Sequence, residues 1–282
     1  KSSFPFQSFI IIIVSSIAVT SAVAGVKKGV KRLSELNLIL AILLLLFVLF
    51  LGPTTFLLGA FSEGIGYYVN QFADLTFNTF AFEQNGRGWF TNWTVMFWAW
   101  WISWAPFVGL FIASISRGRT IREYIFGVLL VPSLFIFLWM TVFGNGAIFL
   151  DTHSAHGALS ALAGNPDILL FTFFEQFPLA TPLCVLAVLM IAVFFITSAD
   201  SGILVMNSIA TGNRPNSPKW QTILWGVLLA LISIILLRAG GLRSLQTMTL
   251  IMALPFGLIM FVLCFCLLQA LRTDQLYHGT KI

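Results

Sequence analysis

Charged side chains are scarce in this sequence. They make up 9% of its 282 residues, whereas hydrophobic residues make up 59%. A soluble globular protein covers its apolar core with a surface rich in charged residues, which this composition does not allow. The sequence therefore excludes a soluble globule and predicts an integral membrane protein.

Histidine and cysteine are also rare, with three of each in the chain. Cys184, Cys264 and Cys266 lie within apolar stretches, which predicts buried free thiols rather than a disulfide framework. His153 and His156 lack a nearby pair of carboxylates, so we expect solvated loop residues rather than metal ligands. No set of nucleophile, base and acid stands out, and the sequence does not predict an enzyme.

Long apolar runs are what the sequence has in abundance. About 20 apolar helical residues span a hydrocarbon core about 30 Å thick, and seven runs approach that length. They are Phe9–Gly25, Leu38–Ala60, Trp93–Ile115, Ile125–Ile148, Pro182–Met206, Ile223–Leu237 and Met248–Leu271. The predicted fold class is therefore all-α and integral to the membrane, with about seven transmembrane helices.

Basic residues indicate the orientation of these spans, because Lys and Arg near span ends are retained on the cytoplasmic side. Eleven of the fifteen follow the first, third, fifth or seventh run, whereas most acidic residues lie in the opposite loops. The N-terminus of the chain is predicted to lie outside and the C-terminus in the cytoplasm. This topology accounts for the net charge of +5, so nucleic acid is not an expected partner. No signal peptide precedes the first run, and we expect an internal start.

Residues 61–91 interrupt the apolar pattern with polar and aromatic side chains, including Glu63, Asp74 and Glu83. A helix of this composition is typical of the membrane interface rather than of a span. We expect an outer interfacial helix followed by a loop.

A faint internal repeat links two distant segments. "GVKRLSELNLILAILLLL" from Gly29 is similar to "GGLRSLQTMTLIMALPFGL" from Gly240, and each opens an apolar run with a glycine and a basic residue. The first turn is predicted inside and the second outside. This relation is typical of the inverted-topology repeats of secondary transporters.

Tryptophans concentrate in the third run, where "WAWWISWAPF" begins at Trp98. At about 100° per residue, five aromatic side chains fall within an arc of about 100°, from which Trp98 points away. They are Trp93, Phe97, Trp100, Trp101 and Trp104. An interfacial belt and helix packing are the alternatives, but three of these tryptophans lie near the predicted midplane, and membrane helices pack through small residues. This aromatic wall predicts binding of a quaternary ammonium cation, which cannot donate hydrogen bonds and is held by π faces.

"WTVMFWAWWISWAPFVGLFIASISRGRTIREY", from Trp93, resembles the signature of the betaine/choline/carnitine transporter (BCCT) family, and "FFITSADSG", from Phe194, resembles a second block of that family. The resemblance implies a LeuT-like inverted-repeat transporter fold. Residues 1–60 would form the last two helices of the first repeat of this fold, and residues 92–271 would form the whole second repeat. The remaining parts would be the outer segment, 61–91, and the start of a cytoplasmic tail, 272–282.

The family's glycine-rich broken helix, and the aromatic residues of the helix that follows it, have no counterpart in this sequence. Part of the substrate site is therefore expected outside the chain. By the same resemblance Trp100, Trp101 and Trp104 would line the substrate pathway, with Trp101 in the aromatic box and Trp93 further out.

The second block implies ion-coupling residues. Thr197, Ser198 and the Phe194 carbonyl would bind Na⁺ in a sodium-coupled member, because hard cations prefer oxygen ligands. The alternative is that the two hydroxyls bond to the preceding helical turn. Asp200 is an acid within an apolar span and is therefore a functional candidate by default. The alternative is that Asp200 lies near the cytoplasmic mouth of the pathway and only caps the local backbone.

Together these features predict a secondary active transporter that imports a quaternary ammonium compound, choline first and glycine betaine or carnitine next, coupled to a H⁺ or Na⁺ gradient. No cofactor is expected apart from Na⁺ as a coupling ion, and the resemblance implies a homotrimer in a bacterial inner membrane. A seven-helix receptor and a cation channel are the alternatives. The last run has no lysine for a retinal Schiff base, and the spans carry almost none of the polar or charged residues that a pore stripe would need.

Overall fold

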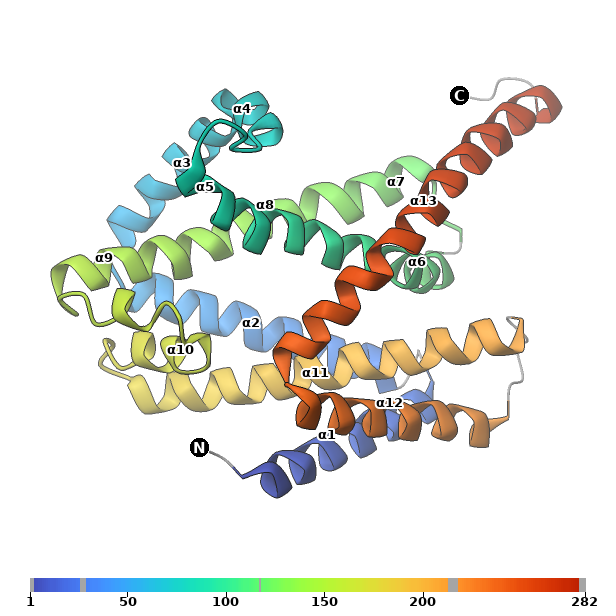
Figure 1. Ribbon diagram of the computed structural model, residues 1–282, viewed down its shortest axis with the longest axis horizontal. Coiled ribbons are helices and arrows are strands. Elements are labelled where there is room, and N and C mark those ends of the chain that lie inside the picture. Colours follow the sequence, from blue (N-terminus) through green and yellow to red (C-terminus); the bar gives the residue numbers. More distant parts are fainter. Residues whose placement is uncertain (1–2, 26–28, 117, 213–217, 279–282) are drawn as a thin grey trace. The chain divides into compact units, whose positions relative to one another are not determined.

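The computed structural model describes residues 3–25, 29–116, 118–212 and 218–278. All regular secondary structure in these residues is helical (Figure 1). The α-helices are α1 (Phe4–Ala24), α2 (Lys31–Leu51), α3 (Thr54–Asn70), α4 (Phe72–Phe77), α5 (Gln84–Trp89), α6 (Met96–Ile115), α7 (Ile121–Ile125), α8 (Val131–Met140), α9 (Gly146–His153), α10 (Pro166–Phe174), α11 (Ala180–Thr211), α12 (Lys219–Ala239) and α13 (Leu242–His278). The π-helical turns η2 (Phe90–Val95), η3 (Phe126–Leu130) and η4 (Thr141–Asn145), and the 3₁₀ turn η5 (Ser160–Leu162), join some of them.

Seven helical segments of the described chain are long and apolar enough to cross a membrane, which confirms the predicted all-α integral membrane protein. They are Phe4–Ala24, Lys31–Leu51, Gly86–Ile115, Ile121–His153, Ala180–Thr211, Lys219–Ala239 and Arg243–Thr273. The third and fourth are each built from consecutive α and π elements. Each segment contains one of the seven runs identified in the sequence, apart from Gly25 at the end of the first run and the end of the second run.

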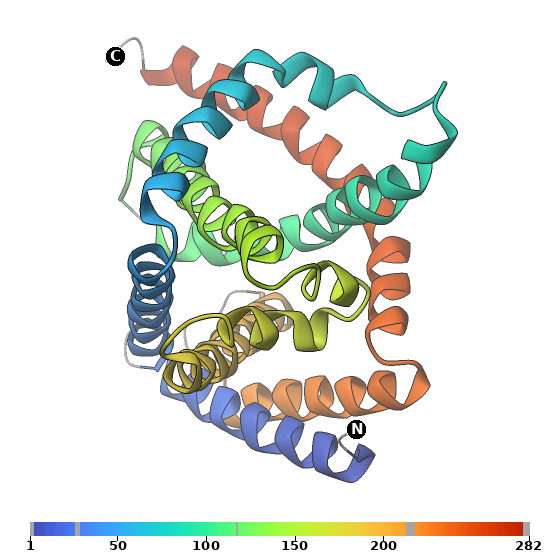
Figure 2. The ribbon, with the colours of Figure 1, turned by 90° about the vertical axis from the view of Figure 1, so that its left-hand side faces the viewer.

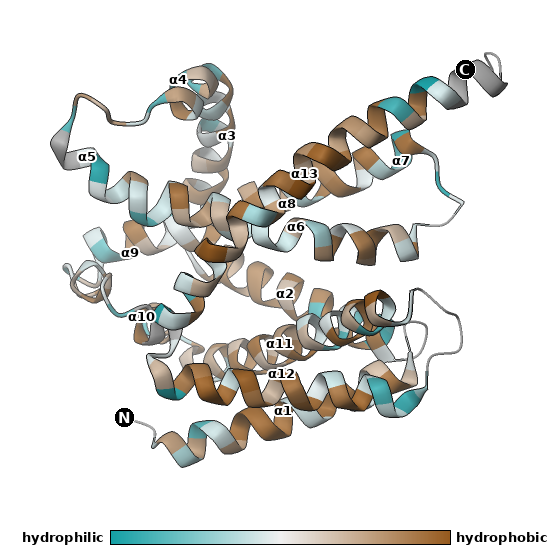
Figure 3. Ribbon diagram, turned by 45° about the vertical axis from the view of Figure 1, so that its right-hand side comes forward, coloured by the Kyte–Doolittle hydropathy of each residue, from teal (hydrophilic) through white to brown (hydrophobic). Residues whose placement is uncertain are grey.

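Apolar side chains remain exposed along these helices, whereas polar residues gather at helix ends and in connecting segments (Figure 3). Phe50 and Phe261, for example, are 69% and 79% exposed. Exposure to water would cost about 25 cal/mol for each Å² of such surface. Lipid tails or further transmembrane helices remove this cost, so the surface suits a hydrocarbon environment.

The second span ends earlier than the sequence predicted. The run Leu38–Ala60 is divided at Gly52 and Pro53, where α2 ends and α3 starts in a new direction (Figure 2). Proline has no N–H for the helical ladder and disfavours a helical conformation in the residue before it. The Thr54 hydroxyl donates to the Leu49 carbonyl at 2.7 Å across the break. The end of the predicted span therefore belongs to α3.

The polar and aromatic segment 61–91 forms the rest of α3, then α4, α5 and the first residues of η2. Neither α3 nor α4 is among the seven helical segments that are long and apolar enough to span a membrane. Their position along the outer membrane surface stays a prediction.

The chain divides into two compact units. The first comprises Lys1–Ile12, Asn78–Arg117 and Val205–Ile282, and the second comprises Ile13–Phe77 and Gly118–Leu204. Helices α6, α12 and α13 belong to the first unit, and α2, α3, α8 and α10 belong to the second.

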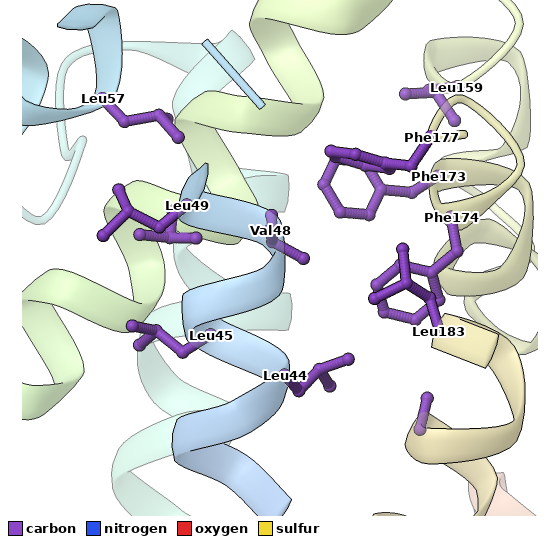
Figure 4. Packing of buried hydrophobic residues seen from close by; sticks show 12 residues of the cluster. Leu44, Leu45, Val48, Leu49, Leu57, Leu159, Phe173, Phe174, Phe177 and Leu183 are labelled. Atoms are coloured by element: carbon purple, nitrogen blue, oxygen red, sulfur yellow. The ribbon is translucent and has the colours of Figure 1, made fainter. Parts of the chain in front are cut away.

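The hydrophobic core of the second unit joins α2 to α10 and α11 (Figure 4). Leu44 and Val48 of α2, Phe174 of α10 and Leu183 of α11 are almost completely buried. Within a bilayer the surrounding lipid is as apolar as these side chains, so close van der Waals packing stabilises the cluster more than removal from water does.

Gly29 lies directly against α1 in the second unit. A methyl group on Gly29 would overlap the Ser21 carbonyl and come within 2.8 Å of Ser21 Oγ. We expect Gly29→Ala to lower the midpoint of thermal unfolding of the detergent-solubilised protein by about 2 to 10 °C, because the backbone must shift. Gly59→Ala is the matched control, since nothing lies within 4 Å of a methyl group there. Equal midpoints for the two variants would contradict the close approach of Gly29 to α1.

The orientation predicted from basic residues stays a prediction. Several of those residues, and the end of the predicted cytoplasmic tail, lie outside the described residues. They are Lys1, Lys27, Lys28, Arg117, Arg214 and Lys281, together with the remainder of 279–282.

Candidate functional site

The aromatic wall lies on η2 and α6 in the first unit. Four of its five predicted members, Trp93, Phe97, Trp100 and Trp104, line one hollow of about 350 Å³. Their side chains are between 41% and 65% exposed, so ring surface is available to a ligand. The spacing of four, three and four residues places these rings on one helical face, as the sequence predicted.

Trp101 does not line this hollow. At about 100° per residue it lies about 80° from Trp93, at the edge of the predicted arc, whereas Met96 lies about 60° away on the other side and does line the hollow. Trp101 instead pairs with Phe97, with ring centroids 6.0 Å apart. The aromatic-box role that the resemblance implies for Trp101 stays a prediction. Trp98, predicted to point away, is also outside the hollow.

Helix α13 forms the other side of the hollow and packs along α6. Gly257 of α13 faces α6, since a methyl group there would make an ordinary van der Waals contact of 3.6 Å with the Ile102 side chain. The lining residues other than the aromatic side chains are Asn92, Met96, Leu245, Gln246 and Thr249.

The polar lining residues were not predicted from the sequence. Gln246 and Thr249 lie three residues apart near the start of a span, and therefore on one face of the helix. That pair was the available signal. Because the pair is far from the tryptophans in the sequence, the sequence alone did not indicate that it lies beside the aromatic wall.

The hollow combines π faces with neutral polar groups. The described residues that line it include no charged side chain. An ammonium ion whose charge is spread over methyl groups needs no carboxylate partner, because the negative faces of indole rings attract it. Asn92 and Gln246 add amide groups that can both donate and accept hydrogen bonds. This arrangement suits a small molecule with a quaternary ammonium group and one polar group.

The predicted ion-coupling residues lie on α11 in the second unit. The Thr197 hydroxyl donates to the Phe194 carbonyl at 3.0 Å, so these two oxygens are adjacent on one helical turn. This is the hydroxyl-to-backbone bond that was the alternative to cation binding. Both oxygens keep lone pairs that a cation can share. Ser198 is partly buried on the same turn. A sodium role for the three residues stays a prediction.

Asp200 is completely buried in α11. Its Oδ2 accepts a hydrogen bond of 2.6 Å from Ser21 Oγ of α1, and Ser201 Oγ lies 3.2 Å from its Oδ1. Ser201 Oγ also lies 2.8 Å from the Thr197 carbonyl, so its one proton is shared between two acceptors. Within the second unit the carboxylate therefore links α1 to α11. The sequence did not predict Ser21, which is 179 residues from Asp200.

His153 ends α9 and His156 lies in the segment after it, and the described residues contain no group of three potential metal ligands around them. The His153 ring stacks on Phe149 with centroids 4.1 Å apart, and its Nδ1 lies 2.9 Å from the Phe149 carbonyl. Asp151 organises the same loop by accepting hydrogen bonds from the backbone N–H groups of Leu159 and Ser160, at 2.8 and 3.2 Å.

The predicted burial of the thiols is wrong for two of the three cysteines. All three are free, but Cys264 and Cys266 are exposed on α13, and only Cys184 is partly buried. An apolar sequence indicates a span but not which of its faces meets protein, because lipid tails satisfy apolar side chains equally well.

Comparison with known proteins relates this arrangement to a transporter family. The profile of BCCT, the betaine/carnitine/choline family transporter, matches residues 1–276. An uncharacterised transporter of Haemophilus influenzae is 54% identical over all of this chain and 42% of its own length. A glycine betaine transporter of Acinetobacter baylyi is 46% identical over 94% of this chain and 40% of its own length. A high-affinity choline transport protein of Escherichia coli is 40% identical over 94% of this chain and 39% of its own length.

The chain thus spans about two fifths of the length of these relatives. Its match to the family profile nonetheless covers both blocks from which the resemblance was drawn, the tryptophan-rich segment and the segment around Asp200. Since the match covers residues 1–276 of the 282, the chain belongs to the betaine/carnitine/choline transporter family.

Proposed function

We propose that this chain serves secondary active import of a quaternary ammonium compound. The observation that carries the proposal is the hollow between α6 and α13, where three tryptophans and a phenylalanine surround a space whose described lining residues carry no charge. Several π faces, each contributing about 0.5 to 2 kcal/mol, make a selective site for a methylated ammonium ion. Trp93, Phe97, Trp100, Trp101 and Trp104 are the proposed substrate-binding residues.

Choline is the first candidate substrate, and glycine betaine and carnitine are the next. All three carry the trimethylammonium group that an indole cluster recognises, and they differ in the polar group at the other end. The names of the relatives support the choice of this class, since one is a glycine betaine transporter and another a choline transport protein.

We propose further that import is driven by an ion gradient through α11, with Phe194, Thr197, Ser198 and Asp200 as the coupling residues. The proposed setting is the inner membrane of a bacterium, with the N-terminus of the chain outside and its C-terminus in the cytoplasm. A homotrimer is the proposed assembly, on the basis of the family resemblance.

Uptake measurements separate this proposal from a cation channel and from a receptor. We expect the full-length protein in proteoliposomes to accumulate labelled choline saturably under an imposed ion gradient, and excess unlabelled glycine betaine or carnitine to compete to different degrees. Ion flux without saturable uptake would instead indicate a channel. Binding of choline without accumulation would indicate a receptor.

A further inference from the structure

The start of α13 gives the aromatic hollow a polar edge. Gln246 and Thr249 line the hollow with Trp93, Trp100 and Trp104 of the third span. The two polar residues differ in what they offer a ligand. The Thr249 hydroxyl donates its proton to the Leu245 carbonyl of its own helix at 2.9 Å. Gln246 is exposed and presents both an amide donor and an amide acceptor.

A quaternary ammonium group can be bound by the π faces but cannot be distinguished by them from another ammonium group of the same shape. Discrimination therefore depends on the group at the other end of the molecule. A hydroxyl both donates and accepts hydrogen bonds, which matches a neutral amide. A carboxylate loses more hydration energy on entering an apolar hollow and needs a positive charge to compensate, which the described lining residues do not supply.

We propose that Gln246 is a specificity-determining residue that hydrogen-bonds the hydroxyl of a quaternary ammonium alcohol while the tryptophans bind its ammonium group. The assignment rests on the proposed function. The volume of about 350 Å³ is near the lower end of the range for small-molecule sites, about 300 to 1,000 Å³, so the two ends of a short molecule reach both walls. The amide of Asn92, from the π turn η2, lines the same hollow and supplements Gln246.

The test compares two cations with the same ammonium group. Choline and n-propyltrimethylammonium have nearly the same length, but the second has a methyl group in place of the hydroxyl. We expect Gln246→Met in the full-length protein to weaken choline binding about three- to tenfold, the loss expected for one net hydrogen bond. Binding of n-propyltrimethylammonium should stay within about twofold, because the π faces are unchanged. Competition of each unlabelled cation against labelled choline in proteoliposomes measures the two affinities.

Gln269→Met is the matched control. Gln269 is also on α13, but it lies about 35 Å along the helix from Gln246 and is not part of the hollow. Neither cation should bind differently to this variant. Gln246→Glu is a second test, since its carboxylate should raise the preference for choline over glycine betaine about two- to fivefold.

The possible results separate this assignment from the proposed function. If Gln246→Met weakens both cations equally, or neither, Gln246 does not read the hydroxyl and the assignment is overturned while quaternary ammonium import stands. If the unmodified protein binds neither choline nor n-propyltrimethylammonium, the proposed function fails and this assignment fails with it. A selective loss of choline supports both.

Discussion

Replacing Trp100 by leucine is expected to raise the choline concentration for half-maximal uptake about two- to thirtyfold. Leucine keeps much of the apolar character of the side chain but removes an indole face that lines the hollow. The range corresponds to the loss of one cation–π contact of about 0.5 to 2 kcal/mol. Uptake of labelled choline by the full-length protein, at equal abundance in the membrane, measures the change.

Trp98→Leu is the matched control for this substitution. Trp98 is on the same helix and is 64% exposed, but it does not line the hollow. We expect its half-maximal concentration to stay within about twofold of the unmodified value, since no π face of the site is lost. Equal effects of Trp98→Leu and Trp100→Leu would mean that the aromatic wall is not the substrate site.

Trp101 distinguishes two placements of the substrate. Family resemblance places Trp101 in the aromatic box, whereas the hollow beside α13 leaves it out. A loss for Trp101→Leu as large as that for Trp100→Leu would mean that substrate reaches the edge of the wall, around the Phe97–Trp101 ring pair. A smaller loss would confine the substrate to the hollow.

Local properties of the sequence were sufficient to predict the spans. A run of apolar residues must match the thickness of the hydrocarbon core, and this requirement does not depend on which helices are neighbours. The error at the second span has a local cause as well. Gly52 and Pro53 were visible as a turn signal, but apolar residues on both sides made the run look continuous.

The site was predictable only where it depends on one helix. Helical periodicity places Trp93, Phe97, Trp100 and Trp104 on one face, and the hollow lies on that face. Gln246 joins them because α13 packs on α6, and Ser21 meets Asp200 because α1 reaches α11. Such contacts between distant segments depend on tertiary packing, which local patterns in a single sequence do not specify.

Removing the carboxylate of Asp200 is expected to abolish the dependence of uptake on external pH. Its described partners are the hydroxyls of Ser21 and Ser201, and the described residues include no ion pair to Asp200. A buried carboxylate without a basic partner needs a proton or a cation to compensate its charge inside the hydrocarbon region. We expect a proton to fill this role, so that uptake by the unmodified full-length protein persists without Na⁺ and rises as external pH falls. Asp200→Asn should lose that rise, because it removes the titrating group at nearly constant size.

The double substitution of Thr197 and Ser198 by alanine tests the competing ion. It removes two of the three proposed cation ligands, together with the bond from Thr197 to the Phe194 carbonyl, and it preserves the helical propensity of α11. If the protein is coupled to protons, the double variant should keep the pH dependence that Asp200→Asn loses. An unmodified protein that takes up no choline without Na⁺, with a double variant that needs at least about tenfold more Na⁺ for half-maximal uptake, would instead assign coupling to sodium at Thr197 and Ser198. The driving ion thus follows from which variant loses its response. Loss of the pH response in Asp200→Asn assigns coupling to protons, and loss of Na⁺ affinity in the double variant assigns it to sodium.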